Sequence, residues 1–113
     1  MLPKSLRVKK QDFPVLIKEG LVFYGLNLQL RVFWPKGSNK TRFSVVVSAK
    51  AVRSSVQRHK YKRLIRALVE GLFPRLVLGA DFVIFIQKNL NKKTKDEITE
   101  EAINLIKKAK LLN

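Results

Sequence analysis

The sequence predicts an α+β fold in which a helix is followed by two or three strands, a second helix, a further strand and a third helix. Apolar and polar residues alternate with a period of two over residues 21–33, which indicates a strand with one buried face. Two short apolar runs, residues 42–48 and 82–87, are typical of buried strands. Apolar residues recur at helical spacing after Ser54 and again from Ile98, which predicts two longer helices.

The N-terminal part of the chain predicts a basic arm and a short helix. Residues 1–11 carry several basic side chains and show no regular period, so we expect a partly mobile arm. Asp12 is a suitable N-cap for a helix over residues 13–19, and Pro14 is tolerated in its first turn. Gly20 is well placed to end that helix.

Three segments predict the strands. Residues 34–39 contain Pro, Gly and Asn and therefore predict a turn after the first alternating segment. The β-branched run of residues 42–48 is expected to be a central strand, and residues 82–87 predict a second buried strand that follows the turn residues Gly79 and Asp81. The apolar positions expected on the buried face of the first segment are Leu26, Leu28, Leu30 and Val32.

The two longer helices have recognisable ends. Ser54 or Ser55 can cap the second helix, which is expected to end at about Leu72, before a Phe-Pro pair. Residues 88–95 predict a polar, basic loop, and Thr94-Lys95-Asp96-Glu97 has the pattern of a capping box at the start of the third helix. The apolar positions of that helix are Ile98, Ala102, Leu105, Ile106 and Ala109.

The charge of the chain predicts a polyanionic partner. Its 113 residues are enough for one domain with its own core, and we expect residues 1–113 to form a single domain. The 24 Lys and Arg against 8 Asp and Glu give a net charge of +16, which repels itself unless a polyanion neutralises it. Nucleic acid is the leading candidate and an anionic membrane surface the second.

Other classes are disfavoured by composition. The absence of cysteine excludes disulfides, Cys-ligated zinc and thiol chemistry. We expect no signal peptide and no membrane association, because no apolar run approaches the roughly 18 residues that a membrane span needs. We therefore expect a cytoplasmic protein.

The segment from Arg58 to Arg66 carries the strongest functional signal. It places five Lys and Arg side chains in nine residues with no acidic residue among them. On a helical wheel Ile65 and its apolar neighbours form one stripe, and the cations lie opposite or beside it. Arg58 lies nearer the apolar edge, which leaves open that it points toward the rim of the sheet. The predicted nucleic-acid contacts are Arg58, His59, Lys60, Lys62, Arg63 and Arg66.

The sequence offers no catalytic side-chain set. His59 is the only histidine, and we interpret it as an RNA contact or a spectator instead of a catalytic base. Asp81 is interpreted as a strand-entry residue, and the acidic residues after Thr94 as stabilising a helix N-terminus. We expect neither a metal site nor a small-molecule cofactor in the protein. Trp34 has no assigned role.

Residues 55–66 (SVQRHKYKRLIR) resemble the signature helix of the bacterial ribonuclease P protein, roughly A-V-x-R-N-R-x-K-R-x-x-R-E. Residues 42–50 are similar to the R-x-G-x-x-V-S-K-K strand of that family, and residues 79–84 to its G-x-D-x-V-x-I strand. The resemblance covers about residues 6–110. The chain departs from the pattern at several positions, among them His59 for Asn, Lys60 for Arg and Ala67 for the closing Glu.

The resemblance implies a small two-layer α/β sandwich in the order α-β-β-β-α-β-α. It also implies a left-handed βαβ crossover, although such crossovers are almost always right-handed. In this family a catalytic RNA, acting with Mg²⁺, cleaves precursor tRNA to form its mature 5′ end, and the protein subunit contributes binding. The expected partners are therefore ribonuclease P RNA and precursor tRNA.

The resemblance also implies two sets of site residues. The basic helix over residues 58–66 corresponds to the surface that contacts the catalytic RNA. Phe13 and Ile17 match first-helix positions that line a cleft for the single-stranded 5′ leader, and Lys50 is the surviving lysine of a strand-end pair. Arg31 and Phe33 lie on the polar side of the first strand, where they could replace a missing aromatic platform.

Three alternatives to this interpretation have different tests. A small basic ribosomal or ribosome-assembly protein would share charge and size but would not stimulate cleavage of precursor tRNA by the catalytic RNA. A stand-alone protein ribonuclease would cleave without RNA and would depend on His59. A DNA-binding module would prefer duplex DNA to a tRNA precursor.

Overall fold

The computed structural model describes residues 4–87 and 95–112. The order of its helices and strands is α1, β1, β2, β3, α2, β4 and α3, which confirms the predicted order. The helices are α1 (Phe13–Glu19), α2 (Ser55–Leu72) and α3 (Lys95–Lys108). The strands are β1 (Leu21–Tyr24), β2 (Leu28–Phe33), β3 (Arg42–Val47) and β4 (Asp81–Ile86).

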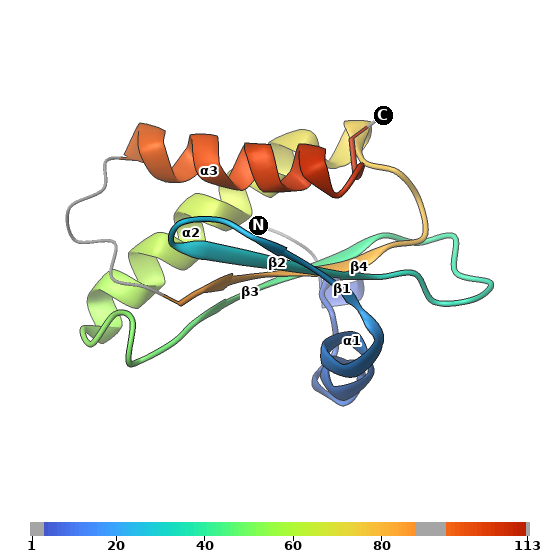
Figure 1. Cartoon of the computed structure of the whole chain (residues 1–113), viewed down its shortest axis with the longest axis horizontal. Coiled ribbons are helices and arrows are strands. Elements are labelled where there is room, and N and C mark those ends of the chain that lie inside the picture. The colour runs from blue at the N-terminus through green and yellow to red at the C-terminus, as the bar shows by residue number, and fades with distance from the viewer. Residues whose placement is uncertain (1–3, 88–94, 113) are drawn as a thin grey trace.

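The strands form one four-stranded sheet in the order β1-β2-β4-β3. β1 and β2 form an antiparallel hairpin, β2 pairs antiparallel with β4, and β3 pairs parallel with β4. Helices α2 and α3 lie on one face of the sheet and α1 lies on the other (Figure 1). The parallel neighbours β3 and β4 are joined through α2, as the crossover prediction requires, and its left-handed sense stays a prediction.

The main core lies between the sheet and the pair α2 and α3. Alternate residues of β2 and β3 point into it, and Ile65 and Val69 of α2 are fully buried against them. Strand β4 is apolar on both faces because it lies between β2 and β3 and is covered on both sides. The predicted positions of α3, Ile98, Ala102, Leu105, Ile106 and Ala109, are all buried in this core.

Two predictions about these elements are wrong, and a third is confirmed only in part. β3 lies at the edge of the four-stranded sheet and not in its centre, and its apolar run reflects burial of alternate residues in the core under α2. Leu26 is 73% exposed because residues 25–27 form the turn of the β1–β2 hairpin. Asp12 occupies the predicted N-cap position of α1, but its side chain makes no capping hydrogen bond and pairs with Arg42 instead.

The part of the N-terminal arm that the structure describes is packed, not irregular. Arg7 forms a parallel bridge with Phe43, so the segment extends the sheet along the outer edge of β3. Val8 is buried, and its N–H donates to Ser44 Oγ at 3.1 Å. The predicted basic loop lies mostly outside the described residues, and the predicted capping box includes Thr94, which also lies outside them.

Candidate nucleic-acid interface

Helix α2 presents its cations from a rigidly held backbone. Ser54 caps its N-terminus by accepting a hydrogen bond from Gln57 N–H at 3.3 Å, as one of the two predicted caps. Ile65 and Val69 fix the opposite side of the helix against the sheet. Of the predicted contacts, His59, Lys60 and Arg63 are exposed, whereas Arg58, Lys62 and Arg66 are half-buried. The helix therefore has a cationic ridge, defined here as these six residues, with its most exposed side chains at positions 59, 60 and 63.

Arg58 differs from the rest of the ridge because its side chain turns back toward the connection that precedes α2. Its Nη1 donates to the carbonyl oxygens of Val52 and Arg53, each at 2.8 Å. Both carbonyls belong to the connection between β3 and α2. This position agrees with the wheel, which placed Arg58 near the apolar edge. Its guanidinium therefore ties the start of α2 to the end of the preceding connection.

Arg66 lies where α2 approaches the N-terminal segment. Burial of its guanidinium lowers the pKa of Arg66, and the nearby positive charge of Arg7 lowers it further. The group nevertheless stays protonated at neutral pH, because a guanidinium begins from a very high pKa. Two arginines from distant parts of the sequence thus concentrate positive charge beside the C-terminal end of the ridge.

The opposite face of the sheet carries a second, smaller apolar cluster under α1. Leu16, Val8 and Val83 are its buried members. Phe13, Phe33, Val46 and Phe85 pack against them and are half-buried. The structure thus brings together two residues that the sequence analysis assigned to the leader cleft, Phe13 from α1 and Phe33 from β2. It adds Val46 and Phe85, which the alternation within β3 and β4 places on this face.

Arg31 connects α1 to this face of the sheet. Its Nη1 donates to the carbonyl oxygen of Ile17 at 2.9 Å, and its Nε donates to Gln29 Oε1 at 3.1 Å. Its guanidinium carbon lies 6.0 Å from the centroid of the Phe85 ring. Ile17 itself is 46% exposed. Positive charge, an aromatic ring and an exposed aliphatic side chain therefore lie next to one another.

Lys50 lies outside this cluster. It is exposed in the turn after β3, where its N–H donates to Ser48 Oγ at 3.1 Å. Of the five residues assigned to the leader cleft, four therefore share the α1 face of the sheet. Lys50 lies on the connection that leads to α2.

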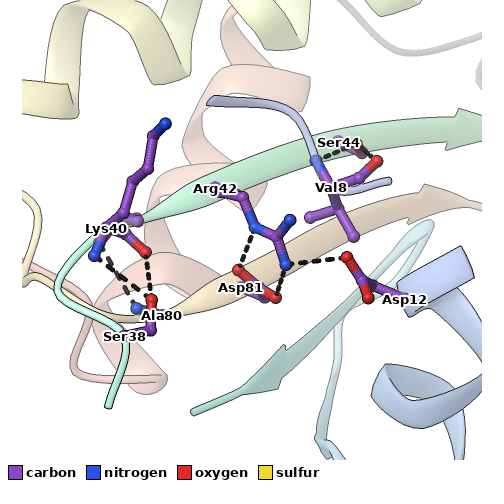
Figure 2. Close-up of polar contacts among 9 residues, drawn as sticks. Val8, Asp12, Ser38, Lys40, Arg42, Ser44, Ala80 and Asp81 are labelled. Carbon is purple, nitrogen blue, oxygen red and sulfur yellow. Dashed lines mark hydrogen bonds and ion pairs between the residues drawn. The ribbon is translucent and has the colours of Figure 1, made fainter. Parts of the chain in front are cut away.

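The sequence analysis missed an ion-pair network at the edge of this face. Arg42 donates from Nε to Asp81 Oδ1 at 2.9 Å and from Nη2 to Asp81 Oδ2 at 2.5 Å (Figure 2). Its Nη2 also lies 3.1 Å from Asp12 Oδ2. Hydrogen bonding to Asp81 raises the pKa of Arg42. Asp81 is 2% exposed, so its role goes beyond entry into a strand.

This network joins three separate elements. Arg42 and Asp81 are direct partners in the parallel register of β3 and β4. Asp12 precedes α1, so its pairing with Arg42 fixes the start of α1 over the edge of the sheet. Only the strand pairing brings these residues together, and no local sequence signal could have identified the network.

Two further observations bear on the class of site. Within residues 4–87 and 95–112, no group of three or more His, Cys, Asp or Glu side chains could hold a metal ion. No helix in the same ranges is long and apolar enough to cross a membrane. The two candidate sites are the cationic α2 ridge and the aromatic α1 face of the sheet.

Comparison with known proteins gives consistent matches. A family model described as Ribonuclease P matches residues 2–110. The ribonuclease P protein component of Dictyoglomus turgidum is 34% identical over 113 residues, covering 97% of this chain and 93% of that protein. The corresponding protein of Nitrosomonas eutropha is 32% identical over 110 residues, covering 96% and 90%.

Solved structures agree on the fold. The structure of the Staphylococcus aureus RNase P protein superposes with a TM-score of 0.88 at 24% identity, covering 97% of this chain and all of that chain. The RNase P protein from Thermotoga maritima gives a TM-score of 0.79 at 23% identity, covering 90% and 96%.

Proposed function

Because the chain belongs to the ribonuclease P protein family and is the protein subunit of that tRNA-processing endoribonuclease, we propose that its two candidate sites divide the RNA between them. The α2 ridge binds the catalytic RNA, and the α1 face of the sheet binds the 5′ leader of precursor tRNA. The 113 residues act as one RNA-binding domain, and the reaction takes place in the cytoplasm.

The observation that carries the first assignment is the one-sided charge of α2. Lys60 and Arg63 are exposed, while Ile65 and Val69 hold the helix on the sheet. Cations on a fixed helix can contact several phosphates without losing much conformational freedom on binding. Each neutralised phosphate releases counterions, so binding of this kind weakens steeply with salt.

The second assignment is supported by the arrangement under α1. Single-stranded nucleic acid binds to grooves that combine positive charge with aromatic rings on which bases can stack. Phe13, Phe33 and Phe85 supply the rings, and Arg31 supplies a charge held in place by the Ile17 carbonyl. Lys50, exposed on the connection after β3, extends the positive surface for a longer leader.

In this proposal the protein binds and positions RNA, and the bond-breaking chemistry belongs to the RNA with Mg²⁺. The cations of α2 reduce the repulsion between the phosphates of the two RNA molecules, which otherwise opposes their association. The protein is therefore expected to matter most at low Mg²⁺, where fewer metal ions screen that repulsion.

Charge reversal tests the docking assignment. The double variant Arg63→Glu/Arg66→Glu is compared with Lys107→Glu/Lys108→Glu, an equal change of charge in the last turn of α3. The α2 variant is expected to bind catalytic RNA more weakly and to flatten the salt slope by about 1.5, because each lost phosphate contact removes roughly 0.7 to 0.9 from it. Circular dichroism checks the fold, and an unchanged slope would exclude α2 as the docking surface.

Leader length tests the second assignment. Precursor tRNAs with progressively shorter 5′ leaders are expected to bind the protein–RNA complex more weakly, because bases leave the α1 face. Phe33→Leu keeps an apolar side chain but removes a ring, and stacking of a base is worth about 1–3 kcal/mol. This variant should reduce the difference between long and short leaders. If leader length has no effect on the wild-type complex, the leader does not bind there.

A further inference from the structure

A hollow of about 490 Å³ lies between α2 and α3, beside the cationic ridge. Its α2 wall is built from residues spaced by three or four along the helix, which therefore share one side of it. This side of α2 lies between the cationic ridge and the side on which Ile65 and Val69 are buried against the sheet. The residues that line it are Gln57, Lys60, Tyr61, Arg63, Leu64 and Ala67 of α2, with Lys95 and Ile98 of α3.

The charges around this hollow are all positive. Lys60 and Arg63 reach it from α2 and Lys95 from the first turn of α3, and all three side chains are exposed. None of the described residues that line it is acidic. Ala67 stands where the family pattern has a glutamate, so neither a carboxylate nor its bulk occupies this position. Of the four acidic side chains of α3, Asp96 is exposed in the first turn, and Glu97, Glu100 and Glu101 line a different hollow, against the β1–β2 turn.

The floor of the hollow is apolar. Leu64 and Ala67 of α2 face Ile98 of α3, which is buried, and Tyr61 adds aromatic surface. A purely phosphate-binding surface has no need of such a floor, since phosphate contacts require only donors and positive charge. An unstacked base, by contrast, needs apolar or aromatic surface for its ring and cations for its flanking phosphates. The volume lies within the roughly 300–1,000 Å³ typical of ligand pockets.

We propose that this hollow accepts one unstacked nucleotide of the RNA that docks on α2. The base lies against Tyr61, Leu64 and Ile98, and the flanking phosphates lie at Lys60, Arg63 and Lys95. This inference rests on the proposed docking of RNA on α2 and adds base recognition to it. It also gives α3 a direct part in RNA binding.

Filling the hollow with a larger side chain tests whether a base binds in it. Ala67→Leu adds apolar bulk without changing charge, and Gly71→Leu is its control, because a Cβ added at Gly71 meets no atom beyond its own stretch of helix within 4 Å, and Gly71 does not line the hollow. Ala67→Leu should weaken binding of catalytic RNA roughly 5- to 150-fold, the range expected for one stacked base, and leave the salt slope unchanged. Gly71→Leu should leave both unchanged. Equal affinities for the two variants would overturn the inference.

The contribution of α3 has its own test. Lys95→Gln should lower the salt slope of catalytic-RNA binding by roughly 0.7 to 0.9, as the loss of one phosphate contact requires. Lys107→Gln, at the other end of α3, is the control and should not change it. If the two lysine variants behave alike, RNA does not reach the rim formed by α3.

A titration of the full-length protein separates this inference from the docking proposal. Adenosine 5′-monophosphate should shift the amide resonances of Ala67 and Ile98, and ribose 5-phosphate at the same concentration should shift them much less. Equal shifts from both compounds would show a phosphate site without base recognition. If charge reversal on α2 weakens RNA binding but Ala67→Leu does not, docking stands and the nucleotide pocket fails. If charge reversal has no effect, docking of RNA on α2 fails, and the titration then shows only whether the hollow binds a free nucleotide.

Discussion

Arg58 and Arg63 lie five residues apart on the same helix, and the structure predicts opposite effects for their substitution by glutamine. Arg58 donates from Nη1 to the carbonyl oxygens of Val52 and Arg53, each at 2.8 Å. Arg63 is exposed on the outward side of α2. We therefore expect Arg58→Gln to affect mainly stability and Arg63→Gln to affect mainly RNA binding.

The size of the first effect follows from the two hydrogen bonds. A hydrogen bond to a charged group contributes about 1.5–3 kcal/mol when it is buried. The bond to Val52 is partly buried and the bond to Arg53 is exposed, so solvent reduces both contributions. We expect Arg58→Gln to lower the free energy of unfolding by about 1–2 kcal/mol and the Tm by roughly 4–10 °C.

The size of the second effect follows from exposure. A surface substitution such as Arg63→Gln should change the free energy of unfolding by no more than about 0.5 kcal/mol. Loss of one phosphate contact should lower the salt slope of RNA binding by roughly 0.7 to 0.9. Thermal unfolding by circular dichroism and RNA binding at several salt concentrations measure the two quantities for both variants.

One result would refute this reasoning. If Arg58→Gln keeps the wild-type Tm and lowers the salt slope as much as Arg63→Gln does, Arg58 is a phosphate ligand like its neighbours. Its hydrogen bonds to the connection between β3 and α2 would then contribute little. The expected result instead assigns Arg58 to holding the start of α2 in place.

Two further substitutions test the contacts that fix the rest of the fold. Among the residues that the structure describes, Asp81→Asn leaves Asp12 as the remaining carboxylate partner of the Arg42 guanidinium. Removal of one member of a buried pair typically costs about 3–5 kcal/mol. Because Arg42 is partly exposed and keeps Asp12, we expect the free energy of unfolding, measured in urea, to fall by about 2–3 kcal/mol. A fall of less than about 0.5 kcal/mol would show that the ion-pair network does not stabilise the fold. Glu101→Ala removes the carboxylate that accepts hydrogen bonds from the Asn27 and Leu28 N–H groups at 2.9 and 2.6 Å. These two amides should therefore exchange hydrogen with solvent faster in the variant. Unchanged protection of both amides against exchange would show that Glu101 does not hold the β1–β2 turn.

Much of the secondary structure was predictable because its signals are local. The bounds of α1 and the end of α2 follow from Pro14, Gly20 and the Phe73-Pro74 pair, which act on the backbone near them. The alternation of β2 identified Leu28, Leu30 and Val32 as buried. Leu26 continued the same alternation but lies in a turn, because the period alone does not show where a hairpin reverses.

The candidate site was only partly predictable for the same reason. Charge on α2 is a property of consecutive residues, so the ridge was visible in the sequence. The grouping of Phe13, Phe33 and Phe85 depends on β2 and β4 being neighbours and on α1 crossing that face. Lys50 was assigned to the same cleft by resemblance, and the structure places it on the connection after β3.

The sequence by itself determined the order of helices and strands, the cationic side of α2 and the family to which they point, since periodicity, charge and motif spacing are carried by neighbouring residues. The tertiary structure decided that β3 is an edge strand, that Arg58 faces the chain itself, and that Arg42 joins Asp81 to Asp12. It also placed Lys95 of α3 beside Lys60 and Arg63 of α2. These arrangements depend on which distant segments pack together, and the packing of the sheet fixes that choice.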